Sequence, residues 1–267
     1  MKKIILISLL TCIFFLRCNK KQNSINLDDA KIIDLTYSFG KETIYWPTAE
    51  SFKLDTVFAG ITDKGFYYAA FQFCAAEHGG THLDAPIHFA KGKQTIDKIP
   101  LTNLIGKAIV IDIKEKALGN KDYLIKIDDF KNWEQKNGKI FDGAIVLLNT
   151  GYARFWSDKE KYMGTAELGP DAVAKLHFPG LDPKAAEWLT KERKIKAIGL
   201  DTPSIDYGQS VLFKSHQILF KHNIPAFENV ANLDNLPPKG AFVFALPMKI
   251  KGGSGGPLRI VAFVNSN

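Results

Sequence analysis

The chain has 267 residues, 46% of them hydrophobic, which suits one large domain with a substantial core and excludes an intrinsically disordered protein. The formal net charge is +7, but the chain holds only four arginines, and its many lysines fit a solvated surface better than a nucleic-acid patch. Nucleic acid is therefore not a predicted partner.

The N-terminus carries the features of an export signal. Lys2 and Lys3 precede an apolar run, residues 4–16, that has the length of a signal-peptide core and is too short to span a membrane comfortably. We therefore predict a signal peptide over residues 1–17 and a polar tether over residues 18–29. The expected location is the periplasm or the cell surface.

Cysteine usage bears on anchoring and on stability. Cys18 directly follows the leader, in the position of a lipid-attached cysteine, but Arg17 departs from the usual pattern there. A lipid anchor to the membrane and plain secretion both remain open. The only cysteine of the body, Cys74, cannot form an internal disulfide, so the fold is predicted to rely on its core.

Stretches rich in β-branched and aromatic residues predict many strands, and no repeat or linker divides the chain. Residues 65–73 are predicted to form a buried strand that delivers the histidine-rich segment after it, with Cys74 as a buried packing residue. The other predicted strands are residues 31–39, 107–113, 144–149, 197–200, 241–246 and 258–264.

Three of the six histidines, His78, His82 and His88, lie within eleven residues, together with Asp84. Two glycines and a proline in this stretch exclude a helical zinc motif. In an extended chain, His82 and Asp84 point the same way because side chains alternate with period two. Imidazole nitrogen with carboxylate oxygen suits zinc, manganese or ferrous iron better than calcium. The segment predicts a metal site, and merely solvated loop histidines are the weaker interpretation.

Three helices are predicted, which makes the class α/β. Residues 182–189 begin with Asp182 as N-cap and a proline in the first turn. Residues 128–136 form a weaker helix, and residues 215–221 a short one that carries His216.

Several polar residues outside the histidine-rich segment are candidates for the site. His216 and Glu228 are twelve residues apart, and either alone would be unremarkable. Asp201 and Asp206 follow an apolar strand, where they could line a pocket, but fixing the local turn is the favoured role. His177 and His222 are predicted to be structural and exposed, respectively.

Two further segments complete the candidate set. Tyr45 and Trp46 could form an aromatic wall for a planar substrate, or ordinary core. The glycine-rich residues 252–257 precede a strand rather than a helix, so they are predicted to form a turn that could flank the site, not a phosphate cradle.

The segment from His78 to His88 resembles the His-x-Gly-Thr-His-x-Asp-x-Pro-x-His motif of the cyclase-like metal-dependent hydrolases, which include bacterial kynurenine formamidases and isatin hydrolases. Further landmarks lie at residues 178–181, 199–206 and 228–233, and the resemblance covers residues 30–264. It implies a swivelling β/β/α architecture with a barrel-like mixed sheet core, a single domain over residues 30–267, and a homo-oligomer.

The resemblance also implies site residues. His88 matches the catalytic acid/base of the family. One or two divalent ions, zinc or manganese, are expected. The residues that match the family's metal ligands are His78, His82, Asp84, His216 and Glu228.

The predicted function is metal-dependent hydrolysis of a carbon–nitrogen amide bond by activated water. By resemblance, the first substrate is an aryl formamide such as N-formylkynurenine, and the alternative is the lactam of isatin. A different class, a non-catalytic surface metal-binding lipoprotein, often carries runs of consecutive histidines, and none occurs in this sequence.

Overall fold

The computed structural model describes residues 29–265. The predicted signal peptide, the lipidation candidate Cys18 and all but the last residue of the predicted tether lie outside this range. Within it, no helix combines the length and the apolar character needed to cross a membrane.

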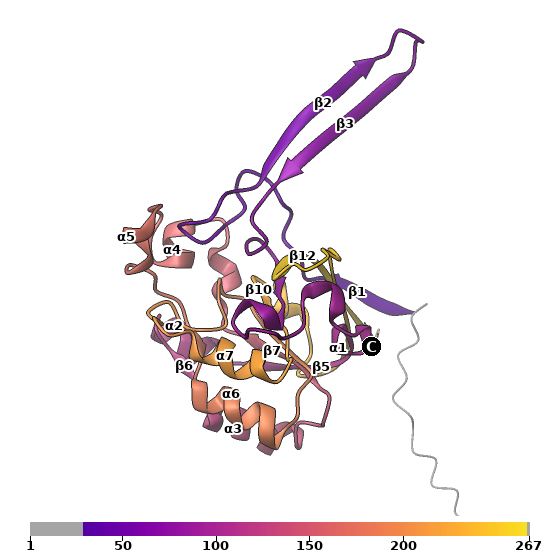
Figure 1. The fold of residues 1–267 in the computed structure, drawn as a ribbon. Helices are drawn as coiled ribbons and strands as arrows, with labels where there is room; N and C mark the ends of the chain where they lie inside the picture. The colour runs from indigo at the N-terminus through magenta and orange to yellow at the C-terminus, as the bar shows by residue number, and fades with distance from the viewer. Residues whose placement is uncertain (1–28, 266–267) are drawn as a thin grey trace, which may run out of the picture.

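A closed mixed sheet organises the domain, as the sequence resemblance predicted (Figure 1). The strand order is β1-β12-β11-β5-β7-β9-β10-β4, and β4 also pairs with β12, so seven strands form a closed barrel to which β1 is added. Strands β5, β7, β9 and β10 run parallel, and the other pairs are antiparallel. The strands are β1 (Ala30–Asp34), β4 (His82–Asp84), β5 (Ile105–Asp112), β7 (Ile145–Asn149), β9 (Ala197–Leu200), β10 (Ala226–Glu228), β11 (Lys239–Pro247) and β12 (Gly255–Asn265).

The central strands are buried on both faces, which explains why they read as continuous hydrophobic runs rather than as alternating ones. In β7, Ile145 and Leu147 belong to the core cluster inside the barrel, whereas Val146 and Leu148 belong to a second cluster outside it. Truncating a fully buried leucine such as Leu147 to alanine typically costs about 2–5 kcal/mol, so packing of these strands contributes strongly to the stability of the barrel.

Helices α3, α6 and α7 cover the outer face of the parallel strands through this second cluster. As predicted, Asp182 caps α6 by accepting a hydrogen bond from the backbone N–H of Lys184. The α-helices are α1 (Leu101–Leu104), α2 (Lys114–Gly119), α3 (Ile127–Asn137), α4 (Lys159–Met163), α5 (Pro170–Val173), α6 (Pro183–Glu192) and α7 (Lys214–Lys221). Four 3₁₀ turns (Pro86–His88, Ile96–Lys98, Tyr152–Phe155, Leu233–Asn235) and a small parallel pair, β6 (Leu124–Ile125) with β8 (Gly180–Leu181), complete the domain.

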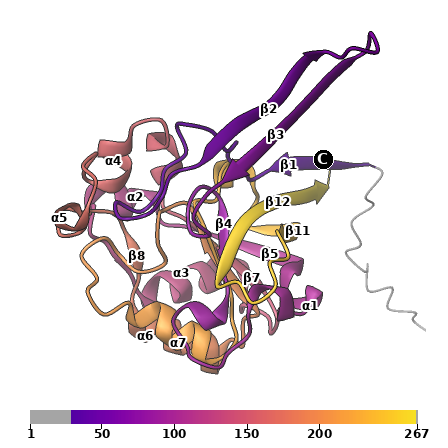
Figure 2. The same ribbon diagram turned by 45° about the horizontal axis from the view of Figure 1, so that its top comes forward.

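One prediction about burial is wrong. Strands β2 (Lys53–Ile61) and β3 (Tyr67–Cys74) form a two-stranded hairpin that projects from the domain (Figures 1 and 2), so the strand predicted at residues 65–73 is present as β3 but is not buried. Cys74 is exposed, not a packing residue. The hydrophobicity of this segment was misleading because nothing else in residues 29–265 covers it.

Candidate metal centre

The short strand β4 brings the motif into the barrel wall. It is hydrogen bonded to β10 on one side and to β12 on the other. Its register places Glu228 opposite His82, and cross-strand partners project from the same face of a sheet. Asp84 lies two residues further along and therefore points the same way. Helix α7 adds His216 to this face, and its imidazole is buried.

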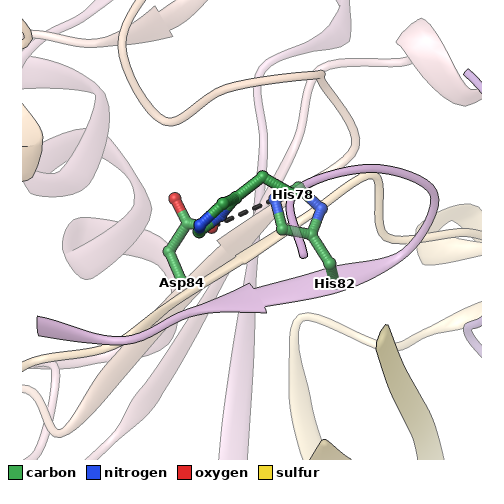
Figure 3. Close-up of side chains that lie close together, drawn as sticks. All are labelled: His78, His82 and Asp84. Atoms are coloured by element: carbon green, nitrogen blue, oxygen red, sulfur yellow. Dashed lines mark hydrogen bonds and ion pairs between the residues drawn. The ribbon is translucent and has the colours of Figure 1, made fainter. Parts of the chain in front are cut away.

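Three imidazoles surround two buried carboxylates. Figure 3 shows the side chains of His78, His82 and Asp84 directed toward one another. Nδ1 of His78 and Nε2 of His82 lie 2.7 and 3.0 Å from Oδ1 of Asp84. Nε2 of His216 lies 3.2 Å from Oδ2 of Asp84 and 3.1 Å from Oε1 of Glu228. The donors form two groups that share Asp84: one with His78 and His82, the other with His216 and Glu228.

The remaining nitrogen of the two buried imidazoles contacts an acceptor on its outer side. Nδ1 of His82 lies 3.0 Å from the carbonyl oxygen of Gly80, and Nδ1 of His216 lies 2.7 Å from the carboxylate of Asp206. A carbonyl or carboxylate can only accept, so each Nδ1 carries a proton. In the neutral imidazole, the lone pair therefore sits on Nε2, which faces the two carboxylates.

His78 is oriented in the opposite sense. Its Nε2 lies 2.9 Å from the hydroxyl of Ser254, whose proton is donated to Glu77 at 2.6 Å. The hydroxyl oxygen must therefore accept from Nε2, and the lone pair of His78 sits on Nδ1, beside Asp84. In their neutral forms, all three imidazoles thus present a lone pair to the carboxylate pair.

This arrangement fits a divalent cation. Nε2 of His82 is buried and has no hydrogen bond, and lone pairs that face carboxylates repel unless a positive charge lies between them. Burial alone lowers the pKa of His82, but the charges of Asp84 and Glu228 raise it to about 9. Burial and the charge of Asp84 raise the pKa of Glu228. A bound metal ion would relieve both effects.

Asp84 behaves as the central anion of the site. Burial alone raises the pKa of Asp84, but the charges of His78 and His82 hold it well below its usual range. It is the residue common to both donor groups, and its two oxygens face different imidazoles. A carboxylate in that position can bridge two ions.

His88 lies beside the donor groups but belongs to neither. The chain leaves its extended course at Pro86, and the 3₁₀ turn places the His88 ring against that of His78, with centroids 3.7 Å apart. In the part of the chain that the structure describes, its imidazole makes ring contacts and no hydrogen bond. Burial lowers the pKa of His88 to about 4. A neutral imidazole with free nitrogens is thus available to a ligand.

A cavity of about 290 Å³ opens over the donor groups. Tyr45 and Trp46, predicted as an aromatic wall, both line it, and the buried hydroxyl of Tyr45 has no hydrogen bond. Among the described residues, no lysine or arginine lines the cavity. Its other apolar lining residues include Ile44, Phe89, Met163, Pro203 and Phe213.

The remaining candidates have structural roles. Asp206 fixes His216, accepting also from the backbone N–H groups of Ser215 and His216, which extends the turn-fixing role favoured from sequence. Asp201 accepts from the backbone and hydroxyl of Thr150. His177 pairs with Asp122 at 2.8 Å, and His222 is exposed.

Sequence reasoning missed Glu77 and Ser254. The signal that could have found them is the glycine-rich segment at residues 252–257. It was predicted to form a turn that could flank the site, and in the structure it does flank the site. A Cβ at Gly255 would lie 2.5 Å from Cε1 of His78, so only glycine allows the turn to approach this ring.

Comparisons with known proteins agree with the family resemblance of the motif. The family described as "Putative cyclase" matches residues 33–207. Isatin hydrolase of Roseibium aggregatum is 32% identical over 241 residues, 87% of this chain and 86% of that protein. Kynurenine formamidase of Salinibacter ruber is 25% identical over 230 residues, 86% of this chain and 96% of that protein. The solved structure of isatin hydrolase A from Ralstonia solanacearum superimposes with a TM-score of 0.80 at 32% identity, covering 89% of this chain and 93% of that one.

Proposed function

Because the chain belongs to the cyclase family and is a metal-dependent hydrolase, we propose that it opens the lactam of a small, uncharged aromatic substrate of the isatin type. The observation that carries this proposal is the combination of three inward-facing imidazole lone pairs with a cavity that has apolar and aromatic walls and no cationic side chain among the described residues.

The cavity favours the lactam over the formamide that the sequence resemblance put first. N-formylkynurenine carries an amino-acid carboxylate, which recognition sites usually pair with arginine or lysine. No such partner lines this cavity among residues 29–265, whereas a planar bicyclic ring suits its aromatic walls. The identity to isatin hydrolase and the TM-score of 0.80 support the same order.

In this proposal, one or two divalent ions would be held by Nδ1 of His78, Nε2 of His82 and Nε2 of His216, together with Asp84 and Glu228. When bound, a divalent ion supplies Lewis-acid chemistry, which polarises a carbonyl and makes water a nucleophile near neutral pH. Asp206, the Gly80 carbonyl and Ser254 keep each imidazole in the orientation that binding requires.

His88 is the proposed proton carrier. It lines the cavity beside the donor groups, and its ring nitrogens are free of hydrogen bonds within the described chain. It would take the proton from the attacking water and deliver it to the ring nitrogen as the carbon–nitrogen bond breaks. Ring opening gives a single product that carries a carboxylate and an aryl amine: the water oxygen joins the carbonyl carbon, one water proton goes to the nitrogen, and the other is released to solvent.

A serine hydrolase is excluded as an alternative at this site. Ser254, His78 and Asp84 have the separations of a Ser-His-Asp triad, 2.9 and 2.7 Å. However, the hydroxyl proton of Ser254 is donated to Glu77, so His78 cannot act as its base. Ser254 is also absent from the residues that line the cavity.

The direct test compares two substrates on the same metal-loaded protein. We expect the kcat/KM for isatin to exceed that for N-formylkynurenine. The reverse order would make the protein a formamidase. Metal content without hydrolysis of either substrate would favour the non-catalytic metal-binding protein.

Glu228→Ala should change the number of metal ions bound. Glu228 belongs only to the second donor group, so the first group, with His78, His82 and Asp84, stays complete. We expect the metal content of the purified protein to fall from two ions to one per chain. Glu187→Ala, an exposed carboxylate on α6, is the control. One ion in both wild type and Glu228→Ala would contradict a two-ion site.

Tyr45→Phe should weaken substrate binding without destabilising the fold. The Tyr45 hydroxyl is buried and unpaired in the free protein, so removing it sacrifices no internal hydrogen bond. A neutral hydrogen bond to a substrate carbonyl contributes about 0.5–1.5 kcal/mol, so we expect roughly a 2- to 10-fold rise in KM. Thermal melting should show an unchanged or slightly higher Tm. An unaltered KM would exclude contact between this hydroxyl and the substrate.

A further inference from the structure

The residue that precedes α7 has an unfavourable backbone conformation. Phe213, at the N-cap position, has φ 47° and ψ 45°, which is the left-handed region. A bulky side chain is strained there, and a phenyl group cannot cap the helix as serine or asparagine would. Of the five non-glycine residues with positive φ in residues 29–265, three are asparagines, which tolerate this region, and Phe213 is the only aromatic one. Such strain persists only where surrounding contacts hold it, and it is concentrated at functional sites.

Hydrogen bonds on both sides hold Phe213 in this conformation. Its backbone N–H donates to the hydroxyl of Ser210 at 3.1 Å, and its carbonyl accepts from the backbone N–H of Gln217 at 3.1 Å. The Ser210 hydroxyl in turn donates to Oδ1 of Asp206 at 3.3 Å. Oδ2 of Asp206 accepts from Nδ1 of His216 at 2.7 Å. One carboxylate thus orients a proposed metal ligand directly and, through Ser210, holds the backbone of Phe213.

The ring of Phe213 joins two walls of the cavity. Its centroid lies 6.3 Å from that of Trp46, 5.1 Å from that of Phe89 and 6.2 Å from that of His216. Trp46 comes from the loop before β2, whereas Phe89 follows the histidine-rich motif. Among the described residues, Phe213 is the only one whose ring contacts both. The three rings therefore form a continuous aromatic surface beside the second donor group.

Packing of the core does not account for this placement. Phe213 is only partly buried, and it belongs to none of the three clusters of buried hydrophobic residues. The two residues before it, Val211 and Leu212, are 84% and 59% exposed. Stability alone would favour asparagine or glycine at a left-handed N-cap. The gain that offsets the strain therefore lies in the cavity, which Phe213 lines.

We propose that Phe213 is the specificity-determining residue of the cavity and that Ser210 positions it. This inference rests on the proposed function and deepens it. A ring fixed between Trp46 and Phe89 gives a planar bicyclic lactam a surface to stack on. It also sets the width of the cavity on this side, so a lactam with a bulky substituent directed toward it is rejected. The strained backbone serves this role because it fixes the ring in one place.

The test compares isatin with isatins that carry a phenyl group at ring position 5, 6 or 7. Phe213→Asn removes the ring and tolerates the left-handed backbone. We expect its kcat/KM for isatin to fall roughly 2- to 10-fold, as for the loss of one aromatic contact, and that for at least one phenyl derivative to rise. The preference for isatin over that derivative should fall by roughly 10-fold or more. The Tm should be unchanged or higher, because the strain is relieved. Leu212→Asn, at the exposed neighbour, is the control and should keep the wild-type preference.

Ser210→Ala separates positioning of the ring from the ring itself. Ser210 does not line the cavity, so this change keeps all its aromatic side chains but removes the hydroxyl that holds Phe213. We expect the metal content to be retained and the preference for isatin to fall in the same direction as in Phe213→Asn, by a smaller factor. The double variant should have the preference of Phe213→Asn alone, because no ring remains to be positioned.

The outcomes separate this inference from the proposed reaction. A wild-type preference for isatin in Phe213→Asn would overturn the inference and leave the reaction standing, and a lowered Tm beside it would make Phe213 a packing residue. Additive effects in the double variant would refute the role of Ser210. A metal-loaded wild type that hydrolyses none of these lactams would overturn the proposed function and this inference with it.

Discussion

Replacing His82 with alanine should remove both the bound metal and the hydrolytic activity. Its Nε2 is buried, lies within 3.0 Å of Asp84 and 3.4 Å of Glu228, and has no hydrogen bond in the absence of an ion. The truncation leaves two buried carboxylates with one counter-charge fewer, so the lost affinity cannot be recovered by rearrangement. We expect activity to fall to background and metal content to fall with it.

The measurement pairs metal analysis with activity. Chelation of the wild type should have the same effect as the His82→Ala substitution, and added zinc or manganese should restore the wild type but not the variant. His222→Ala is the matched control, because it removes an exposed imidazole close to α7. Full activity in metal-free wild-type protein would refute the proposed mechanism.

His88→Ala should separate catalysis from metal binding. His88 belongs to neither donor group, yet its ring stacks on His78 at 3.7 Å and lines the cavity. General acid–base residues typically contribute ~10²–10⁴-fold in rate. We therefore expect kcat to fall by that factor while most of the metal is retained.

The comparison that decides this assignment is with His82→Ala, measured in parallel. A loss of metal in His88→Ala as complete as that in His82→Ala would make His88 a ligand. Unchanged turnover with full metal content would leave the proton transfer to another group or to solvent.

Much of the fold could be predicted from the sequence because the residues of its central strands strongly favour β-structure. The strand at residues 197–200 has the predicted limits, and α6 begins at its predicted cap, Asp182. These elements combine strong local preference with burial, so local and tertiary signals agree. Strands β4 and β10 have three residues each and are defined by their neighbours, which no local pattern reports.

The structure brings the predicted ligand residues together, but the orientation of their imidazole rings could not be predicted from sequence. The motif and the family resemblance identified the five residues that converge on the cavity. They could not indicate that Ser254 and Asp206 orient two imidazoles, because these contacts span 176 and 10 residues. The β2–β3 hairpin was wrongly predicted to be buried. Its hydrophobic side chains indicate a surface that is unfavourable to expose to water, but they do not indicate that another part of the same chain packs against it.

Barrel closure by β4 sets the order in which the protein can assemble. Strand β4 pairs with β10 and with β12, which lie far from it in the sequence. These pairings therefore cannot be complete until the last strand, β12, is in place. Asp84 and His216 are 132 residues apart, and contacts of such separation form slowly because loop closure precedes any gain in contacts. The donor group with Asp84, His216 and Glu228 therefore cannot assemble early in folding, and a two-ion site would be completed only in the final step, when the ring of strands closes.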